Sequence, residues 1–138
     1  MQRPSTSPYR FLLDVHSGVP VYRQIIDQVR GGLASGALIA GDQLPTVRQL
    51  AVDLAINPNT VVRAYKELEL GGLLETHQGT GTFVAAHKPH LSGSEREKQL
   101  GQIVSDAVSR AGAAGFTVDD LLEQLRTRSA GPTSKEKV

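Results

Sequence analysis

The chain has 138 residues, no cysteine, and 15 Lys and Arg against 14 Asp and Glu, for a net charge of +1. This length allows one domain with at most a small addition, and the lack of cysteine excludes disulfides, zinc-finger sites and a thiol nucleophile. A charge so close to zero does not by itself indicate a nucleic-acid partner, so such a function must depend on where particular charges lie. With no signal-peptide core and no apolar run long enough to span a bilayer, we expect a soluble, cytoplasmic protein without a membrane partner.

The N-terminal part predicts one helix preceded by an irregular segment. Residues 1–10 are rich in Pro, Ser and Thr, and we expect them to be disordered. FLLDV (11–15) predicts a short extended segment. A helix follows from Pro20 to about residue 35, with Gly36 as its stop and an inward apolar stripe of Tyr22, Ile25, Ile26, Val29 and Leu33. The loop after this helix is predicted to tuck three apolar residues beneath the next one: Leu38, Ile39 and Leu44.

A second helix is predicted directly after Pro45. Thr46 and Gln49 have the spacing of a capping box, which marks the start of a helix. Its buried face comprises Val47, Leu50, Ala51 and Leu54. Only AIN (55–57) separates this helix from the next, and so short a connection predicts a sharp turn between two crossed helices.

A third helix is predicted over residues 58–70. Asn57 suits its cap, Pro58 suits its first position, and Gly71 and Gly72 end it. The inward stripe comprises Val61, Ala64, Tyr65 and Leu68. The outward side carries polar residues instead: Asn59, Thr60, Arg63 and Lys66.

Two short strands follow, Leu73–His77 and Thr82–Ala85, around the turn Gln78-Gly79-Thr80-Gly81. Two glycines within four residues are typical of a tight hairpin. A helix-turn-helix followed by a hairpin is a winged helix-turn-helix. The predicted fold is therefore mainly α with a small β-hairpin, and the winged domain spans residues 11–86.

The C-terminal part predicts a linker over 87–93, a two-helix region over 94–128 and a disordered tail over 129–138. AGAAG (111–115) separates the two helices, and Thr117 with Asp120 caps the second. Apolar stripes with no further chain to cover them should pair two subunits, which makes this a dimerisation region. The predicted dimer residues are Leu100, Ile103, Val104, Ala107, Leu121, Leu122 and Leu125. Alternatively, the helices fold back on the winged domain of their own chain.

Polar residues near the N-terminal end of the second helix of such a motif read base edges in the DNA major groove. Asn pairs with adenine, Arg pairs with guanine, and Thr bonds a base or packs on a thymine methyl group. The N-termini of both helices also favour phosphate. The candidate DNA-binding residues are Thr46, Arg48, Asn57, Asn59, Thr60, Arg63, Gln78, Gly79 and Thr80.

The stretch LPTVRQLAVDLAINPNTVVRAYKELELGGLLETHQGTGTFV (44–84) resembles the DNA-binding domain of GntR-type bacterial transcription regulators. The family pattern is met by Leu44, Pro45, Thr46, Arg48, Leu50, Ala51, Asn59, Thr60, Val61, Ala64, Tyr65, Leu68, Gly72, Leu73, Gly79, Gly81, Thr82, Phe83 and Val84. The resemblance covers about residues 11–85 and implies DNA contacts from the following residues: Arg48, Asn59, Thr60, Gln78 and Gly79. Many members carry arginine where this chain has Pro58 and Val62, so we expect its operator to differ from theirs.

The short C-terminal region and the segment PNTVVRAYKELE (58–69) resemble those of the YtrA-like group of this family. That resemblance implies a homodimer paired through its C-terminal helices, and regulated genes that encode an ABC-type transporter. The predicted function is a sequence-specific repressor bound to double-stranded DNA at a palindromic operator. The sequence does not indicate whether a small-molecule effector binds.

Two other functions with a winged helix are a protein–protein interaction module and an architectural binder without sequence preference. The polar outward residues of the third helix favour DNA over a protein partner, and the low net charge disfavours the architectural binder. His77, His87 and His90 are expected to be solvent-exposed rather than metal ligands. Gly79-Thr80-Gly81 lacks the Lys-Ser/Thr of a phosphate loop. No nucleophile stands out beside a base, so we expect no enzyme, cofactor or metal.

Overall fold

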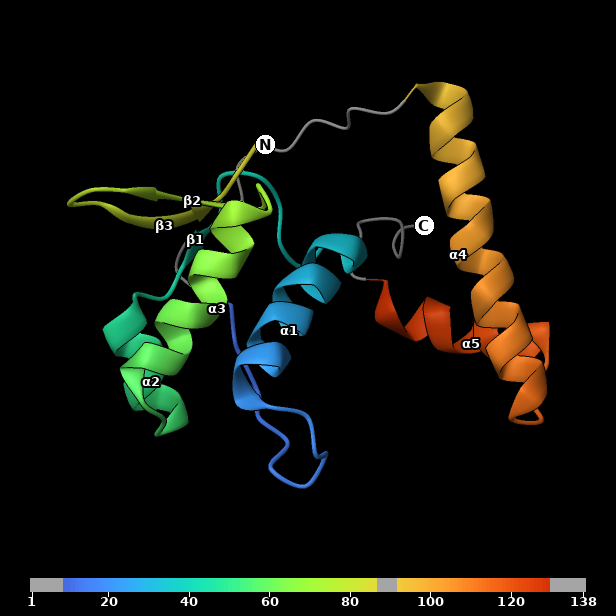
Figure 1. Cartoon of the computed structure of the whole chain (residues 1–138), viewed down its shortest axis with the longest axis horizontal. Helices are drawn as coiled ribbons and strands as arrows, with labels where there is room; N and C mark the ends of the chain where they lie inside the picture. The colour runs from blue at the N-terminus through green and yellow to red at the C-terminus, as the bar shows by residue number, and fades with distance from the viewer. Residues whose placement is uncertain (1–8, 87–91, 130–138) are drawn as a thin grey trace, which may run out of the picture. The chain divides into compact units, whose positions relative to one another are not determined.

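The computed structural model describes residues 9–86 and 92–129 of the chain. The chain divides between His87 and Lys88 into two compact units. The first holds α1 (Val21–Ser35), β1 (Gln43–Leu44), α2 (Val47–Leu54), α3 (Pro58–Leu70), β2 (Leu74–His77) and β3 (Gly81–Val84), and the second holds α4 (Gly93–Ala113) and α5 (Val118–Arg128) (Figure 1). The predicted class, a mainly helical winged helix-turn-helix followed by two helices, is confirmed.

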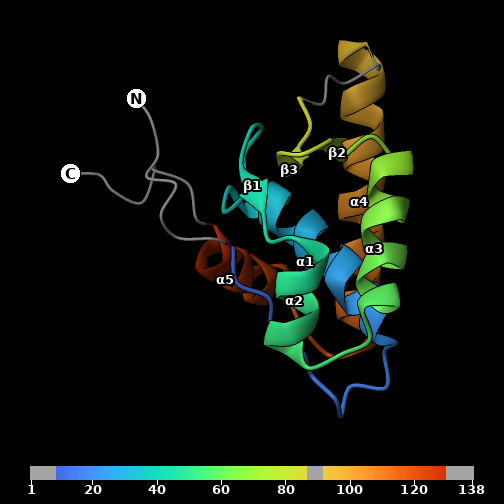
Figure 2. The same ribbon diagram turned by 90° about the vertical axis from the view of Figure 1, so that its left-hand side faces the viewer.

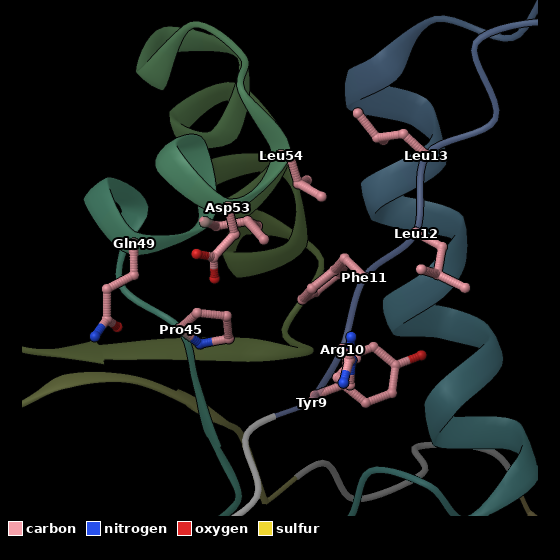
Figure 3. Close-up of a pocket in the computed structure, with 10 residues that line it drawn as sticks. Tyr9, Arg10, Phe11, Leu12, Leu13, Pro45, Gln49, Asp53 and Leu54 are labelled. Atoms are coloured by element: carbon pink, nitrogen blue, oxygen red, sulfur yellow. The ribbon is translucent and has the colours of Figure 1, made fainter.

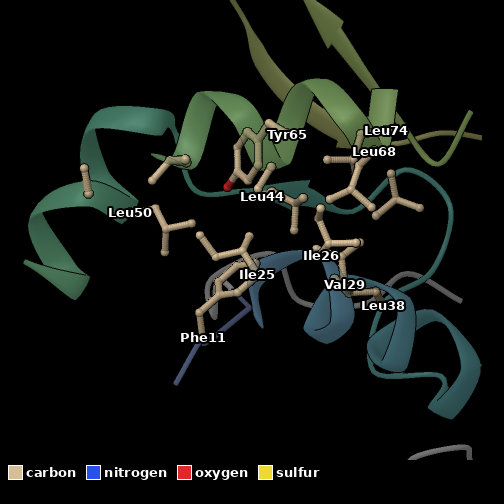
Figure 4. Packing of buried hydrophobic residues seen from close by; sticks show 14 residues of the cluster. Phe11, Ile25, Ile26, Val29, Leu38, Leu44, Leu50, Tyr65, Leu68 and Leu74 are labelled. Carbon is tan, nitrogen blue, oxygen red and sulfur yellow. The ribbon is translucent and has the colours of Figure 1, made fainter. Parts of the chain in front are cut away.

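The core of the first unit lies where the three helices meet. α3 packs against both α1 and α2 (Figure 2). The predicted inward stripes pack there as buried or half-buried side chains, and β1 and β2 each add a buried leucine from the sheet (Figure 4). The buried residues are Phe11, Ile25, Ile26, Val29, Leu38, Leu44, Leu50, Ala51, Val61, Ala64, Tyr65, Leu68, Leu74 and Val84. Because α3 is buried along one side only, its other side is left for solvent or a partner.

The segment before α1 lies against that helix through side-chain hydrogen bonds. Gln28 accepts the backbone N–H of Leu12 and donates to its carbonyl, and Gln24 accepts the N–H of Asp14. These two amides, one helical turn apart, satisfy the backbone of an extended segment that has no strand beside it. The packing reaches back to Tyr9, whose hydroxyl donates to the Gln28 carbonyl at 2.8 Å. Pro20 is the residue before the helix rather than its first residue.

The loop between α1 and α2 differs from the prediction at one residue. Leu38 and Leu44 are buried as expected, but Ile39 is 48% exposed. A turn closes at this point, since Asp42 donates its N–H to the Ile39 carbonyl and accepts the Ile39 N–H through its side chain. The turn directs Ile39 outward. It also brings Gln43 and Leu44 alongside β3, which adds a third strand to the predicted hairpin, in the order β1-β3-β2.

The capping predictions for α2 and α3 are confirmed. The Thr46 hydroxyl accepts the N–H of Gln49, and the Gln49 side chain accepts the N–H of Thr46. Asn57 Oδ1 accepts the N–H of Asn59 at 2.8 Å. Between the two helices, Ala55 adopts the left-handed conformation, with φ of 56°. A left-handed residue at this position ends α2 and turns the chain away from the helix axis, so three residues suffice to join two crossed helices.

The second unit is a pair of helices that contact each other near their connection. α4 begins at Gly93, one residue before the predicted start, because Ser92 and Glu95 form a capping box. The bonds from the Ser92 backbone and side chain lower the pKa of the Glu95 carboxyl group. Thr117 and Asp120 cap α5 as predicted. Of the predicted linker 87–93 and tail 129–138, residues 87–91 and 130–138 lie outside the described residues.

Candidate nucleic-acid interface

The N-terminal end of α3 presents the predicted reading residues to solvent. Burial of the inward stripe fixes the rotation of the helix, so Asn59 and Arg63, each two positions from buried Val61, must point outward. Asn59 and Arg63 are exposed and Thr60 is half-buried. Asn57 caps the helix through its carbonyl oxygen, which leaves its amide nitrogen as a donor for another partner.

Four of these predicted residues line one shallow hollow together with the start of α1. Its volume is about 370 Å³, and its lining residues are Val21, Tyr22, Asn57, Asn59, Thr60 and Arg63. Arg63 lies across the ring of Tyr22, with the guanidinium carbon 3.6 Å from the ring centroid. Within the described parts of the chain, no carboxylate pairs with Arg63. The hollow thus combines amide and hydroxyl groups with one cation, the chemistry that reads base edges.

The N-terminal end of α2 carries the other predicted pair, Thr46 and Arg48. The Thr46 hydroxyl oxygen serves as a cap, and Arg48 is exposed in the first turn. The place of this end relative to α3 is set by Tyr65, whose hydroxyl donates to the Pro45 carbonyl at 2.7 Å. Tyr65 is 4% exposed, and burial raises its pKa above the ordinary tyrosine value. Tyr65 therefore remains a neutral donor that ties the two helices together.

Replacing Tyr65 with phenylalanine is expected to lower the free energy of unfolding by about 1 kcal/mol, because the Pro45 carbonyl then loses its donor inside the core. Urea denaturation of the purified protein measures this change. Tyr9→Phe is the matched control, since it also removes a hydroxyl that donates to a backbone carbonyl, but from a side chain that is only half-buried. A loss for Tyr9→Phe equal to that for Tyr65→Phe would contradict this role of Tyr65.

The wing presents a neutral tip. Gln78, Gly79 and Thr80 are exposed in the turn that joins β2 to β3, closed by a bond from the Thr80 N–H to the His77 carbonyl. No lysine or arginine occurs between residues 72 and 86. His77 lies 3.7 Å from the Glu75 carboxylate. The wing tip can therefore offer amide, hydroxyl and backbone donors to DNA, but no arginine or lysine charge.

A residue outside the wing supports its tip. Gln43 donates from its side-chain amide to the Thr80 carbonyl at 3.1 Å. The same amide nitrogen would lie only 2.6 Å from a Cβ atom at Gly81, where φ is +136°. Glycine is favoured at this position because other residues rarely adopt this backbone conformation. A Cβ atom there would also require the end of the Gln43 side chain to move.

Two positions depart from the usual family pattern, and both lie on the accessible side of α3. Pro58 and Val62 are exposed, with 44% of Val62 accessible. Many family members have arginine at these two positions, whereas the side chains of Pro58 and Val62 are apolar. The polar side chains that remain at this end of the helix are those of Asn59, Thr60 and Arg63.

The predicted dimer residues leave most of their apolar surface accessible within the second unit. Leu100, Ile103 and Leu125 are 62%, 59% and 61% exposed. Val104, Ala107 and Leu122 are also exposed, Leu121 is half-buried, and Ala111 is the one residue of the described part of this unit that is buried. Contact between α4 and α5 therefore leaves their apolar stripes largely uncovered.

A second hollow of about 840 Å³ lies between the N-terminal segment and α2 (Figure 3). It is lined by Tyr9–Leu13 on one side and by Pro45, Gln49, Leu50, Asp53 and Leu54 on the other. None of the predicted DNA-binding residues lines it. The predicted reading residues gather instead at the ends of α1 and α3.

Residues 9–86 and 92–129 contain neither a cluster of metal-binding side chains nor a helix suited to span a membrane. Within these ranges no group of three or more His, Cys, Asp or Glu side chains is placed to hold a metal ion. His87 and His90 lie outside the described residues. No helix in the same ranges combines the length and the apolar character needed to cross a bilayer.

Two residues at this surface, Tyr22 and Gln43, were not among the predicted site residues. Tyr22 belongs by spacing to the inward stripe of α1, and it is only half-buried because it lies at the edge of the core. Gln43 is an ordinary loop residue in sequence. Their contacts span 41 and 37 residues, so no local pattern marks them.

Comparison with known proteins agrees with this geometry. Residues 21–84 match the family described as "Bacterial regulatory proteins, gntR family". The chain is 36% identical to the HTH-type transcriptional regulator YhcF of Bacillus subtilis, over 83% of this chain and 94% of that protein. It is 35% identical to the HTH-type transcriptional repressor YtrA of the same organism, over 86% of this chain and 91% of that protein.

The fold also matches a crystal structure described as a transcriptional antiterminator from Listeria monocytogenes. The TM-score is 0.65 at 25% sequence identity, and the match covers 96% of this chain and 98% of the other. The similarity thus includes both the winged unit and the helical pair.

Proposed function

Because this chain belongs to the GntR family of bacterial regulatory proteins, we propose that it acts as a homodimeric repressor that binds a palindromic operator. As a member of this family, the protein is a transcription regulator with a DNA-binding winged helix. The family is not enzymatic. The repressor role, the operator symmetry and the regulated genes are the proposed part.

One observation carries the sequence-specific part of the proposal. The hollow at the start of α3 gathers Asn57, Asn59, Thr60 and Arg63, all pointing away from the core. The N-terminal end of a recognition helix enters the major groove, where amide, hydroxyl and guanidinium groups distinguish base pairs. A protein-binding groove would instead place apolar residues at its centre.

The distribution of charge supports specific binding over non-specific binding. The net charge is only +1, so the chain as a whole is only weakly attracted to the phosphate backbone. Non-specific affinity rises with the number of such contacts, whereas base readout depends on a few placed donors. We therefore expect a large ratio of specific to non-specific affinity.

The uncovered stripes of α4 and α5 support the homodimer. Each exposes leucine, isoleucine or valine side chains in register along one side of a helix. A second copy would bury both stripes by two-fold symmetry, and a two-fold dimer requires a palindromic site. Such a dimer represses most simply by covering a promoter.

Two further points rest on similarity alone. The repressor role is supported by the similarity to a protein described as a transcriptional repressor. The expectation that the regulated genes encode an ABC-type transporter rests on the resemblance to the YtrA-like group.

Footprinting on DNA from upstream of the protein's own gene tests the proposal. We expect one protected region with two-fold symmetry, and affinity that falls as salt rises. Selection of binding sites from random duplexes covers the case in which the operator lies elsewhere. Failure to enrich any sequence would contradict specific DNA binding and favour the protein-interaction module, and an asymmetric enriched site would contradict the symmetric dimer.

A further inference from the structure

A contact between α1 and α3 holds the one cation among the predicted reading residues of α3. The Arg63 guanidinium carbon lies 3.6 Å from the centroid of the Tyr22 ring. That separation is stacking contact, well within the roughly 6 Å over which an aromatic face attracts a cation. A second guanidinium, that of Arg23, lies at 6.0 Å from the same ring, at the limit of this range.

The two partners differ in how firmly they are held. Tyr22 is half-buried and packs against the core, so its ring has a fixed place. Arg63 is exposed, and an exposed arginine otherwise samples many rotamers, which costs free energy when it is ordered on a partner. A ring fixed by the core can therefore restrict an arginine that the helix alone would leave mobile.

The restricted guanidinium of Arg63 lies beside the other predicted reading residues of α3. Asn57, Asn59 and Thr60 line the same hollow as Tyr22 and Arg63. A guanidinium pairs with guanine through a planar two-bond fork, so its orientation decides whether the pairing forms. Stacking on the ring fixes that plane beside the other reading groups.

From these contacts we infer that Tyr22 is a positioning residue for operator recognition, which acts by orienting Arg63 before DNA binds. This inference rests on the proposed function, and it makes the start of α1 part of the specificity of α3. Tyr22 need not touch DNA itself.

A double-mutant cycle on the purified full chain tests the inference, with the selected operator duplex as probe. Tyr22→Leu removes the aromatic face but keeps an apolar side chain, and Arg63→Ala removes the cation. We expect Tyr22→Leu to weaken operator binding by about three- to ten-fold, the cost of ordering one long side chain. In the Arg63→Ala background the same change should have no further effect.

Lys66 supplies the matched control for the cycle. It is another exposed cation of α3, and among the described residues the cations over the Tyr22 ring are Arg23 and Arg63, not Lys66. Tyr22→Leu and Lys66→Ala should therefore weaken binding additively. Tyr22→Phe retains an aromatic face and should bind like the natural protein.

A nuclear magnetic resonance measurement without DNA tests the contact itself. The ring current of Tyr22 should shift the Arg63 side-chain protons upfield in the natural protein, with Arg63→Lys identifying the signals. Tyr22→Leu should abolish the shift, provided that circular dichroism shows the variant folded. If Tyr22→Leu does not fold, the shift in the natural protein and the binding by Tyr22→Phe still decide the outcome.

The other possible outcomes distinguish failure of the inference from failure of the proposed function. Absence of specific binding by the natural protein would overturn the proposed function. Unchanged binding by both Arg63→Ala and Tyr22→Leu would overturn only the inference. If Arg63→Ala weakens binding but Tyr22→Leu does not, only the inference fails. The inference is also overturned if Tyr22→Leu weakens operator binding equally in the presence and in the absence of Arg63. Tighter operator binding by Tyr22→Leu would overturn it too, because the ring would then hold the arginine away from DNA.

Discussion

Replacement of Ile103 by glutamate is expected to convert the proposed homodimer into a monomer while α4 stays helical. Ile103 is 59% exposed on the apolar stripe of α4, so a glutamate there costs little in an isolated chain. In the proposed dimer the same carboxylate would enter an apolar interface, where an unpaired charge is strongly disfavoured. Light scattering of the purified variant measures its mass.

The effect on DNA binding should be larger than the loss of any single contact. In a dimer, binding at one half-site makes binding at the second half-site intramolecular. Losing that linkage commonly reduces overall affinity by about 10²- to 10⁴-fold. Gel-shift titration with the full operator and with one half-site measures this: the variant should bind both with similar, weak affinity.

Ser109→Glu is the matched control for Ile103→Glu. Ser109 is an exposed residue of the same helix on the side opposite the apolar stripe, so it receives the same charge without entering the interface. This variant should remain dimeric and keep its operator affinity. A natural protein that is monomeric at micromolar concentration, or an Ile103→Glu variant that stays dimeric, would contradict pairing through α4. The helices would then have to be covered by their own chain or by another partner.

Arg63→Ala should weaken operator binding by about 5- to 150-fold and relax specificity at one base pair, since a guanidinium that reads guanine is worth about 1–3 kcal/mol. Among the reading residues of α3, Arg63 is the one cation, and Pro58 and Val62 offer no charged substitute. Titration against operators changed one base pair at a time measures both effects. At one base pair of the operator, substitution should weaken binding by the natural protein but leave the affinity of the Arg63→Ala variant unchanged.

Arg48→Ala separates a phosphate contact from a base contact at the start of α2. If Arg48 meets a phosphate, its loss should weaken binding to all operator variants equally and reduce the salt slope by about one. Arg30→Ala is the control, because Arg30 is exposed in the second half of α1, outside the predicted interface, and carries the same charge. Equal losses for Arg30→Ala and Arg63→Ala would show that total charge, rather than placed groups, governs binding.

The local elements of this protein could be predicted from the sequence because their causes are local. Thr46 with Gln49, and Thr117 with Asp120, form the capping boxes that their spacing predicts. The stripes at helical spacing in α1, α2 and α3 become the buried core. The glycine-rich turn after His77 closes a hairpin. Each depends on residues within a few positions of one another, so order along the chain is sufficient.

Other features depend on where helices cross and on which loop lies beside which strand. The stacking of Arg63 on Tyr22, the support of Thr80 by Gln43 and the bond from Tyr65 to Pro45 all join residues 20 or more positions apart. The exposure of Ile39 and the third strand follow from one turn at residues 39–42. By itself, the sequence determined which side of α3 faces outward and which groups it carries. Only the tertiary structure decided how those groups are held, because a contact between helices depends on packing of the whole core rather than on local spacing.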